Sequence, residues 1–448
     1  MIRRLFLFVT TLTLLLTACT DTDSFTADRN QRLTFQQDTV WLDTLFTGVP
    51  SATYGFWVHN RSADGLRIST VRLERGNQTG FRVNVDGTFL NPVAQDLEVR
   101  KGDSLLVFVE LTAYENHSDE PRRVDDNLLF TLESGVVQRV NLCAYSWDAE
   151  RLTSLHVERD TTLTSVRPLV VYGDGITVAP DATLTLRNTT LYFHGDARLR
   201  VEGRLVVEHC VLRGDRLDRM FSYLPYDRIS GQWRGIEVAK GAAGCWLTDT
   251  EVRNAWDALT ADSTRVVLSN SVLHNSRGHG LYAKDSQVEL DGCQLSNAEG
   301  DCLSLHGCEA WVDHCTLAQF YPYAAPRGAA LRFGPTTQPL VLRCSNTLMT
   351  GYEDDVLQGV ERDSTTVDYR FENCLMRTPE VDDSVAFSRV IWETPKDEVQ
   401  GKQHFATIDE ENFIYDYHIV SLSPAYEPRI GRAFKQEDDT VDDTDNKQ

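Results

Sequence analysis

The feature that most constrains the fold is a six-residue pattern that recurs about every 22 residues. Each copy has apolar residues at positions one and six, a turn-tolerant residue at position three, and a small or polar residue at position four. The small residues at 189, 210, 250, 271, 293 and 315 are separated by gaps of 21, 40, 21, 22 and 22. This spacing indicates a solenoid with one insertion. The clear copies are Leu186–Leu191, Val207–Leu212, Leu247–Val252, Leu268–Leu273, Leu290–Leu295, Val312–Leu317 and Phe371–Met376.

A second short apolar stretch follows many of these copies. Because the units are short and show no helical period, they predict a parallel β-helix. A leucine-rich repeat has a similar period, but its LxxLxLxxN consensus is absent. The residues at position three tolerate left-handed backbone, which predicts a sharp bend there. They are Asn188, His209, Asp249, Asn270, Gly292, His314 and Asn373.

The residue after each bend is expected to point into the core. Cys210, Cys293, Cys315 and Cys374 occupy this position, so we expect a column of small side chains in a dry core. Disulfides remain the alternative, since an exported protein can form them. No CxxC pair is present, so a zinc ribbon is not indicated and no metal ligands are predicted.

The region before the repeat has a different pattern. Between residues 35 and 150, short alternating stretches such as Tyr54–Val58, Phe81–Val85 and Leu105–Leu111 are separated by turn residues. About seven strands over this length predict an antiparallel β-sandwich. The predicted fold class is therefore all-β, with an N-terminal antiparallel β-sandwich followed by a right-handed parallel β-helix over residues 151–400.

The N-terminus indicates export. Arg3 and Arg4 precede an apolar stretch from Leu5 to Leu16, and Leu16–Cys19 resembles the lipobox of bacterial lipoprotein signals. The resemblance implies a signal peptide over 1–18, lipidation of Cys19 and membrane attachment through acyl chains, with a tether over 19–34. A short transmembrane anchor is the alternative. Thr20–Asp23 resembles the surface-export signals of Bacteroidota lipoproteins, which implies a surface-exposed outer-membrane lipoprotein of a Gram-negative bacterium.

Two further resemblances bear on the folded units. Val58–Ile68 with Val140–Tyr145 resembles immunoglobulin-like domains of the abnormal-spindle type. Gly175–Val207 resembles the opening coils of exported right-handed β-helix proteins of the pectate-lyase-like superfamily, and Ser423–Gly431 resembles their closing motif. This implies a closing segment over 401–434, and many such proteins act on polysaccharides. Residues 435–448 are acidic and are expected to be disordered.

Two insertions in the repeat are expected to form a cleft. The first, 213–235, and the second, between Leu317 and Leu331, lead into strands four rungs apart, or about 19 Å at about 4.8 Å per rung. Three rungs with short turns lie between them, which predicts two walls and a floor. Aromatic residues of the insertions could stack on sugar rings. They are Tyr223, Tyr226, Trp233, Tyr321 and Tyr323.

The floor carries the candidate catalytic residues. Stacking of equivalent turns places Asp257, His279 and Asp301 in one column. Gly278–Gly280 and Gly300–Leu303 resemble polygalacturonase segments, although one aspartate is missing and the order of the segments is reversed. Carboxylates two rungs apart lie at the upper limit for inverting glycoside hydrolysis. The alternative is ordinary turn chemistry of the repeat. The flanking candidates for substrate binding are Trp256, Arg277 and Glu299.

A lyase would need a calcium site and a basic residue. Carboxylates of the first insertion (Asp215, Asp218 and Asp227) and its arginines (Arg216, Arg219 and Arg228) could provide these, but a solvated or ion-paired loop is the alternative. No other cofactor is predicted, since the sequence has no P-loop, Rossmann fingerprint, HExxH or GxSxG motif.

The net charge of −22 excludes electrostatic binding of nucleic acid. The expected function is that of a lipid-anchored cell-envelope protein whose β-helix presents a glycan-binding cleft, and which could act as a polysaccharide hydrolase or lyase. The alternative is a structural or adhesive surface scaffold that binds a protein partner, which the sequence does not identify.

Overall fold

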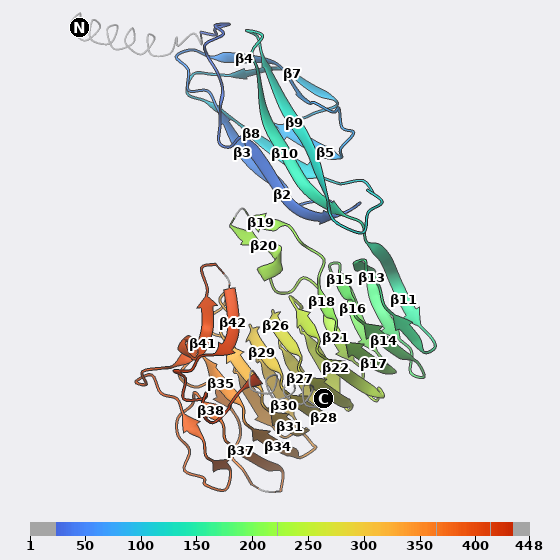
Figure 1. Ribbon diagram of the computed structural model, residues 1–448, viewed down its shortest axis with the longest axis vertical. Helices are drawn as coiled ribbons and strands as arrows, with labels where there is room; N and C mark the ends of the chain where they lie inside the picture. The colour runs from blue at the N-terminus through green and yellow to red at the C-terminus, as the bar shows by residue number, and fades with distance from the viewer. Residues whose placement is uncertain (1–23, 222, 364, 413, 433–448) are drawn as a thin grey trace, which may run out of the picture. The chain divides into compact units, whose positions relative to one another are not determined.

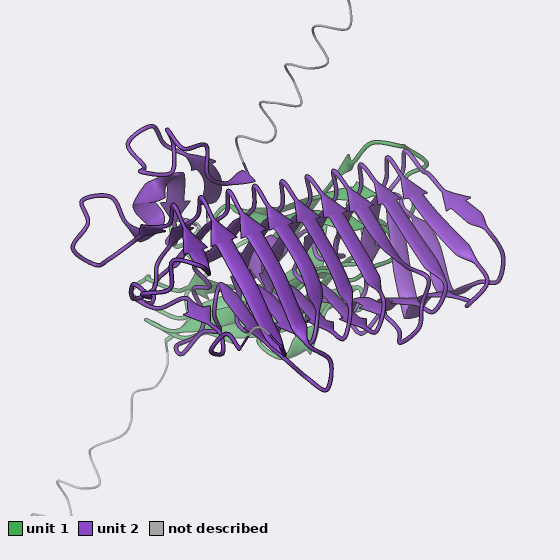
Figure 2. Cartoon of the chain, turned by 90° about the horizontal axis from the view of Figure 1, so that it is seen from below, with its two compact units in different colours: residues 1–147 green, residues 148–448 purple. Residues whose placement is uncertain are grey.

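The computed structural model describes residues 24–221, 223–363, 365–412 and 414–432. The chain divides into two compact units, residues 1–147 and 148–448, close to the predicted boundary at 150 (Figures 1 and 2). Among the described residues, no helix is long and apolar enough to cross a membrane. The predicted signal peptide, Cys19 and the tail from 435 lie outside the described residues.

The first unit is a β-sandwich, as predicted. Two five-stranded sheets enclose one apolar core, and alternate residues along each strand point into it. One pair departs from the antiparallel pattern, because β2 and β10 are parallel. In the sequence, β2 comes near the start of the unit and β10 at its end, so the chain between them is long enough for the connection that a parallel pair needs. The sheets are β1 (Thr34–Phe35), β3 (Tyr54–His59), β8 (Ser104–Leu111), β5 (Phe81–Val85) and β6 (Thr88–Phe89), and β2 (Thr39–Phe46), β10 (Val137–Trp147), β9 (Arg122–Leu132), β4 (Leu66–Leu73) and β7 (Val93–Val99).

Part of the stretch expected to be a tether packs on this sandwich. The Thr26 amide donates to the Gly65 carbonyl at 3.0 Å, and Leu33 is 3% exposed. The Arg67 guanidinium lies 4.5 Å from the Phe25 ring centroid. Residues 24–33 therefore belong to the folded unit, because their apolar side chains find partners on it.

The second unit is a parallel β-helix, which confirms the predicted fold class. Its strands pair in parallel from coil to coil, and Figure 2 shows them stacked side by side. One wall is a ten-stranded sheet. Its strands are β12 (Thr161–Leu163), β14 (Thr183–Arg187), β17 (Arg204–Glu208), β22 (Gly244–Thr248), β25 (Arg265–Ser269), β28 (Gln287–Asp291), β31 (Glu309–Asp313), β34 (Leu340–Ser345), β37 (Val367–Glu372) and β39 (Phe387–Ser388).

The other strands form one bent sheet with two columns that share β11 (Glu150–Val157) and β13 (Leu169–Val178). One column is β15 (Thr190–Phe193), β18 (Val211–Gly214), β23 (Glu251–Arg253), β26 (Val272–Ser276), β29 (Gln294–Ala298), β32 (Thr316–Gln319), β35 (Leu348–Gly351), β38 (Leu375–Met376) and β40 (Ile391–Trp392). The second column is β16 (Arg198–Val201), β21 (Gly235–Val238), β24 (Leu259–Asp262), β27 (Leu281–Lys284), β30 (Leu303–His306), β33 (Leu331–Gly334) and β36 (Leu357–Gln358).

The bends lie where the repeat predicted them. All seven residues at the third pattern position have positive φ, between 46° and 64°. The small residue that follows each bend points inward, and Cys210, Cys293, Cys315 and Cys374 are buried free thiols. The predicted core column is therefore confirmed. A second bend, at Asn254, Asn275 and Asn297, separates the two columns of the bent sheet and also has positive φ.

The chain then folds back on the solenoid. After η2 (Gly401–His404), the hairpin of β41 (Phe405–Asp409) and β42 (Ile414–Ile419) packs on β32, β35 and β38 through an apolar cluster that includes Phe320, Leu348 and Phe405. His404 is fully buried, 3.0 Å from Glu393 Oε2 and 2.8 Å from Ser423 Oγ. This arrangement has the atoms of a Ser–His–Glu triad, but no substrate could reach it. It therefore attaches the closing segment to the last coils.

Candidate functional site

The first insertion lies across the bend between the two strand columns. It forms a short hairpin, β19 (Arg219–Phe221) with β20 (Leu224–Pro225), and the single turn η1 (Tyr226–Arg228). Asn254 Nδ2 donates to the Asp227 carbonyl at 2.8 Å, and Asn275 Nδ2 donates to the Arg228 carbonyl at 3.0 Å. The asparagines that make the bend therefore also hold the loop over it.

The two insertions meet, so the prediction of an open cleft between separate walls is wrong. Their strands are four rungs apart as expected, from Ile236 to Leu331. However, Ser230 Oγ lies 2.8 Å from the Tyr321 hydroxyl. The first insertion follows the solenoid axis over the intervening bends, because the asparagine side chains bind its backbone carbonyls. This closes the space that the spacing alone had left open.

Asp257, His279 and Asp301 come together as predicted. His279 Nδ1 lies 3.2 Å from Asp257 Oδ1, and Nε2 lies 3.7 Å from Asp301 Oδ2. The His279 amide also donates to Asp257 Oδ1 at 2.7 Å. We call residues 255–257, 277–279 and 299–301 the His279 corner.

The roles that these residues can take at the corner are limited. The Asp301 side chain is 5% exposed, accepts from Arg332 Nε at 2.7 Å and accepts from the Ala329 amide at 2.8 Å. The imidazole of His279 lies between the two carboxylates, where a glycosidic bond or an attacking water would need to be. The geometry therefore favours a partly exposed polar network over an acid–base pair.

Two of the predicted sugar platforms are buried, contrary to expectation. Trp233 is 1% exposed and stacks on Phe193 with ring centroids 4.1 Å apart. Its Nε1 donates to the Arg253 carbonyl at 2.9 Å, so it fills the solenoid core at the start of a coil. Tyr321 is 3% exposed, and its hydroxyl group is hydrogen-bonded to Ser230. Aromatic residues at an insertion can pack inward as readily as outward, and the sequence pattern does not distinguish the two.

The other predicted binding residues are dispersed. Trp256 is 39% exposed, but the guanidinium groups of Arg277 and Arg234 lie 4.7 and 5.5 Å from its ring centroid. Tyr223 is exposed and stacks with Phe221, while the half-buried Tyr226 lies under the Arg216 guanidinium. Glu299 is exposed at the His279 corner. None of these residues lines the cavity described next, whereas Tyr323 does.

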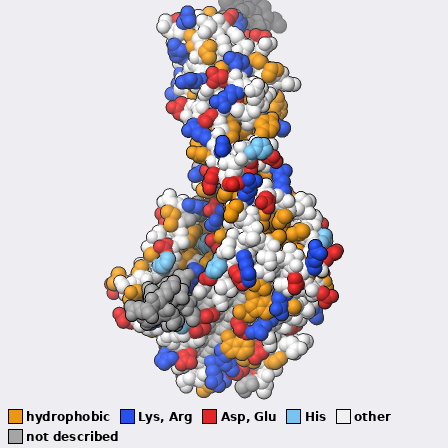
Figure 3. Space-filling view, turned by 45° about the vertical axis from the view of Figure 1, so that its right-hand side comes forward, with side chains coloured by type: hydrophobic (Ala, Val, Ile, Leu, Met, Phe, Trp, Pro, Cys, Tyr) orange, Lys and Arg blue, Asp and Glu red, His pale blue; other side chains and the backbone are white. Residues whose placement is uncertain are grey.

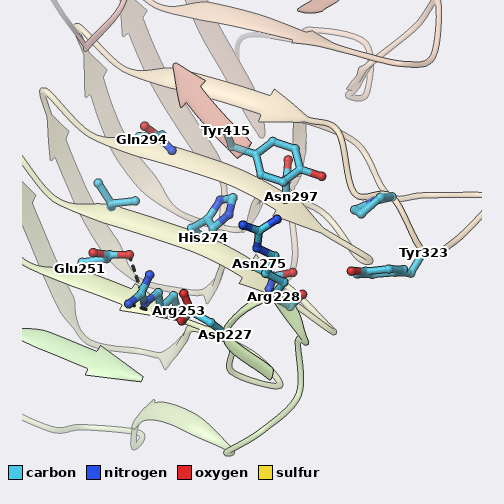
Figure 4. Close-up of a pocket in the computed structure, with 12 residues that line it drawn as sticks. Asp227, Arg228, Glu251, Arg253, His274, Asn275, Gln294, Asn297, Tyr323 and Tyr415 are labelled. Atoms are coloured by element: carbon cyan, nitrogen blue, oxygen red, sulfur yellow. Dashed lines mark hydrogen bonds and ion pairs between the residues drawn. The ribbon is translucent and has the colours of Figure 1, made fainter. Parts of the chain in front are cut away.

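A cavity lies over β23, β26 and β29, the strands that precede the His279 corner in each coil. Its volume is about 340 Å³, within the range of about 300–1,000 Å³ usual for ligand pockets. We call it the His274 pocket (Figure 4). Its floor is the outward face of β23, β26 and β29, and its walls are the two insertions and β42. It is lined by Asp227, Arg228, Glu251, Arg253, Val272, His274, Asn275, Gln294, Asn297, Pro322, Tyr323 and Tyr415.

His274 lies at the centre of this pocket, between Arg253 and Tyr415 (Figure 4). Its Nδ1 is 2.8 Å from Ser296 Oγ, and its ring centroid is 5.6 Å from that of Tyr415. Burial, together with the nearby Arg253 charge, lowers the pKa of His274 to about 4. The imidazole is therefore neutral at neutral pH and can exchange single hydrogen bonds with an uncharged ligand.

The aromatic walls come from segments far apart in the sequence. Tyr323 is 45% exposed, and desolvation with the neighbouring Tyr321 raises its pKa to about 12. Tyr415 stacks with Tyr417 in β42, and the Tyr417 hydroxyl donates to Asn297 Oδ1 at 2.7 Å. That bond fixes the hairpin to the floor of the pocket and so positions the Tyr415 ring.

Sequence reasoning missed most of this pocket. Glu251, Arg253, His274 and Gln294 are the outward-facing residues of β23, β26 and β29, and a run of polar residues at alternate positions was the available signal. Nothing in the sequence placed Tyr415 here, because its position depends on how the closing hairpin folds back.

The carboxylates proposed for calcium are each engaged elsewhere. Asp215 lies 2.7 Å from His194, Asp218 accepts from Arg216 at 2.8 Å, and Asp227 pairs with Arg213 at 2.8 Å. Because they face different partners, they do not form one cation site. They instead form ion pairs and hydrogen bonds in and around the loop, which was the alternative expectation.

Among the described residues, one other group brings possible metal ligands together. Ligand atoms of Asp291, Asp313 and His314 lie within 4.8 Å of one another. Asp313 already accepts from Ser345 Oγ at 2.6 Å and Asn346 Nδ2 at 2.8 Å. Burial opposes its ionisation, but bonds from His314, Ser345 and Asn346 lower the pKa of Asp313. Asp313 and His314 are therefore held together in a hydrogen-bonded bend.

Comparison with known proteins gives structural similarity only. No protein-family model and no curated protein matches the sequence. The catalytic unit of a GH87 alpha-1,3-glucanase from Streptomyces thermodiastaticus strain HF3-3 is 12% identical over 76% of this chain and 89% of that one, with a TM-score of 0.26. An ASH / PapD-like domain of human CEP192 is 11% identical over 30% of this chain and 93% of that one, with a TM-score of 0.18.

A protein of unknown function from Porphyromonas gingivalis W83 is 14% identical, with a TM-score of 0.20. The match covers 29% of this chain and 59% of that one, so it spans less than two thirds of that protein. At these TM-scores the similarities establish neither a shared fold nor a shared activity.

Proposed function

We propose that this is an exported, lipid-anchored cell-envelope protein that binds a glycan in the His274 pocket. The observation that carries the proposal is the combination of two tyrosine rings with a row of amide side chains in one cavity. Tyr323 and Tyr415 offer flat apolar faces to sugar rings, while Asn275, Gln294 and Asn297 offer hydrogen bonds to hydroxyl groups.

The shape of the pocket favours the end of a chain over its middle. The bond between Ser230 and Tyr321 joins the two insertions, and the bond between Tyr417 and Asn297 joins the hairpin to the floor. Both bonds lie beside residues that line the pocket. Because these contacts bound two sides of the pocket, we expect the ligand to be a short oligosaccharide or the terminal residues of a glycan.

The test is a calorimetric titration of the mature, unlipidated protein with oligosaccharides of increasing length. We expect affinity to rise with the first residues and then to level off once the pocket is filled. Tyr323→Ala should weaken binding about tenfold. Tyr223→Ala, which removes an exposed tyrosine outside the cavity, is the control. If no glycan binds to the folded protein, the scaffold alternative replaces this proposal.

Cleavage of a polysaccharide is a second candidate, favoured by the contact of His279 with carboxylates on both ring nitrogens. It predicts new reducing ends from a polysaccharide and loss of that product in Asp257→Asn and His279→Ala. Product release that persists in both variants would exclude the His279 corner as its source.

The anchor is proposed from the N-terminal resemblance alone, and Cys19 is its attachment point. Metabolic labelling with an alkyne fatty acid should label the wild-type protein in a Gram-negative host and should not label Cys19→Ala. Labelling that survives this substitution would contradict the anchor. Protease treatment of intact cells then tests exposure at the outer surface.

A further inference from the structure

The arginines that line the His274 pocket have carboxylates beside them. Arg253 lies between two carboxylates, with Nε 3.4 Å from Glu251 Oε1 and Nη2 3.5 Å from Asp227 Oδ1 (Figure 4). Asp227 also pairs with Arg213, whose side chain is 8% exposed. The lining therefore contains two arginines, Arg228 and Arg253, and two carboxylates. In Figure 3, acidic and basic side chains are likewise interspersed over the visible surface.

We propose that the pocket selects an uncharged sugar over an acidic one, and that Glu251 sets this preference. The inference rests on the proposed function, because it concerns the ligand of the same pocket. A sugar carboxylate or sulfate that approached Arg253 would meet Glu251 and Asp227 on either side of it. The ligand's negative charge and these two carboxylates repel each other at such short range.

An uncharged sugar meets no such opposition. Its hydroxyl groups can exchange hydrogen bonds with Asn275 and Gln294, which lie on the floor, and with the neutral imidazole of His274. Because the ion pairs around Arg253 stay intact, binding does not require any charged group of the pocket to be separated from its partner.

The test uses Glu251→Gln, which keeps the size of the side chain and removes its charge. Calorimetry would compare neutral trisaccharides of glucose, mannose, xylose and galactose with the trisaccharides of galacturonate and guluronate. For the wild-type protein we expect a neutral trisaccharide to bind at least about fivefold more tightly than either acidic one.

In Glu251→Gln we expect the ratio of the affinity for the acidic trisaccharides to the affinity for the neutral ligand to rise at least about threefold. Glu208→Gln is the matched control, because Glu208 also pairs with an arginine, Arg187 at 2.7 Å, but lies on β17 outside the pocket. Glu208→Gln should leave both affinities unchanged.

The outcomes separate the two proposals. If an acidic trisaccharide binds as tightly as the neutral ones or more tightly, or if Glu251→Gln does not favour the acidic ligands, the selectivity is refuted while glycan binding stands. If none of the six trisaccharides binds to the folded protein, both the proposed function and this inference are overturned.

Discussion

The His279 corner and the His274 pocket lie on neighbouring strands of the same coils, yet they are assembled differently. The corner is made by equivalent residues of successive turns, so that Asp257, His279 and Asp301 come into contact through stacking alone. The pocket has a floor from the repeat, but its walls come from two insertions and from the hairpin that carries Tyr415. In this solenoid the repeat therefore produces a polar network, and segments outside the repeat turn part of the strand surface into a pocket.

The largest expected effect is on the free energy of unfolding, and it distinguishes a buried tryptophan from an exposed one. Trp233→Ala removes a buried ring that stacks on Phe193, and should lower the free energy of unfolding by about 3–5 kcal/mol. Trp256→Ala at the corner should cost about 1 kcal/mol or less, because that ring is exposed. Urea unfolding followed by circular dichroism measures both. Equal losses would contradict the assignment of Trp233 to the core.

The second prediction concerns Glu393, which holds the closing segment, and with it the hairpin wall of the pocket, in place. Burial opposes ionisation of Glu393, but hydrogen bonds from His404 and Arg377 more than offset it and lower its pKa. Glu393→Gln should destabilise the protein by about 3 kcal/mol at pH 7 and weaken glycan binding, because the hairpin is less firmly held.

The pH dependence of this effect follows from the direction of the pKa shift. Since the pKa of Glu393 is depressed in the folded state, its contribution is present above about pH 4.3, the ordinary value for glutamate, and is lost as pH falls through the folded pKa. Thermal unfolding at pH 7 and pH 3 should therefore show the gap between wild type and Glu393→Gln narrowing in acid. A gap that widens would refute this sign.

A third prediction compares the aromatic wall with the corner directly. Tyr415→Ala should weaken glycan binding about tenfold while the protein stays folded, because β42 is also held by Tyr417. His279→Ala should leave binding within about twofold. Titration of both variants with the same ligand gives the answer. The reverse order of effects would move the binding site to the corner.

The smallest effect concerns pH and His274. Because burial holds the pKa of His274 near 4, affinity should be nearly constant between pH 8 and pH 5 and should fall as pH approaches 4. An ordinary histidine would change its charge near pH 6.5. A clear midpoint in affinity between pH 6 and pH 7 would contradict the lowered pKa of His274 and the burial that causes it.

The features that could be predicted from the sequence are those that belong to the repeat. Asn270 and His314 occupy equivalent positions, so a left-handed bend at one implied a bend at the other, and the inward position of Cys293 and Cys315 followed from it. The contact of His279 with Asp257 and Asp301 had the same origin.

The parts that occur only once in the chain could not be derived in this way. Trp233 was expected on a wall and lies in the core, because a single aromatic residue at the end of an insertion leaves no pattern in the sequence that shows its direction. The meeting of Ser230 with Tyr321 depends on loop conformation, and the position of Tyr415 depends on a hairpin about 140 residues beyond β26. Long-range packing of this kind leaves no local pattern.

Hydroxyl-radical footprinting with and without a bound oligosaccharide tests the central claim most directly, because one measurement reports on both regions. We expect the ligand to protect Tyr323 and Tyr415, while Trp256 at the His279 corner reacts as it does in the free protein. Protection of Trp256 with unchanged reactivity of the two tyrosines would contradict the claim that the His274 pocket is the glycan-binding site.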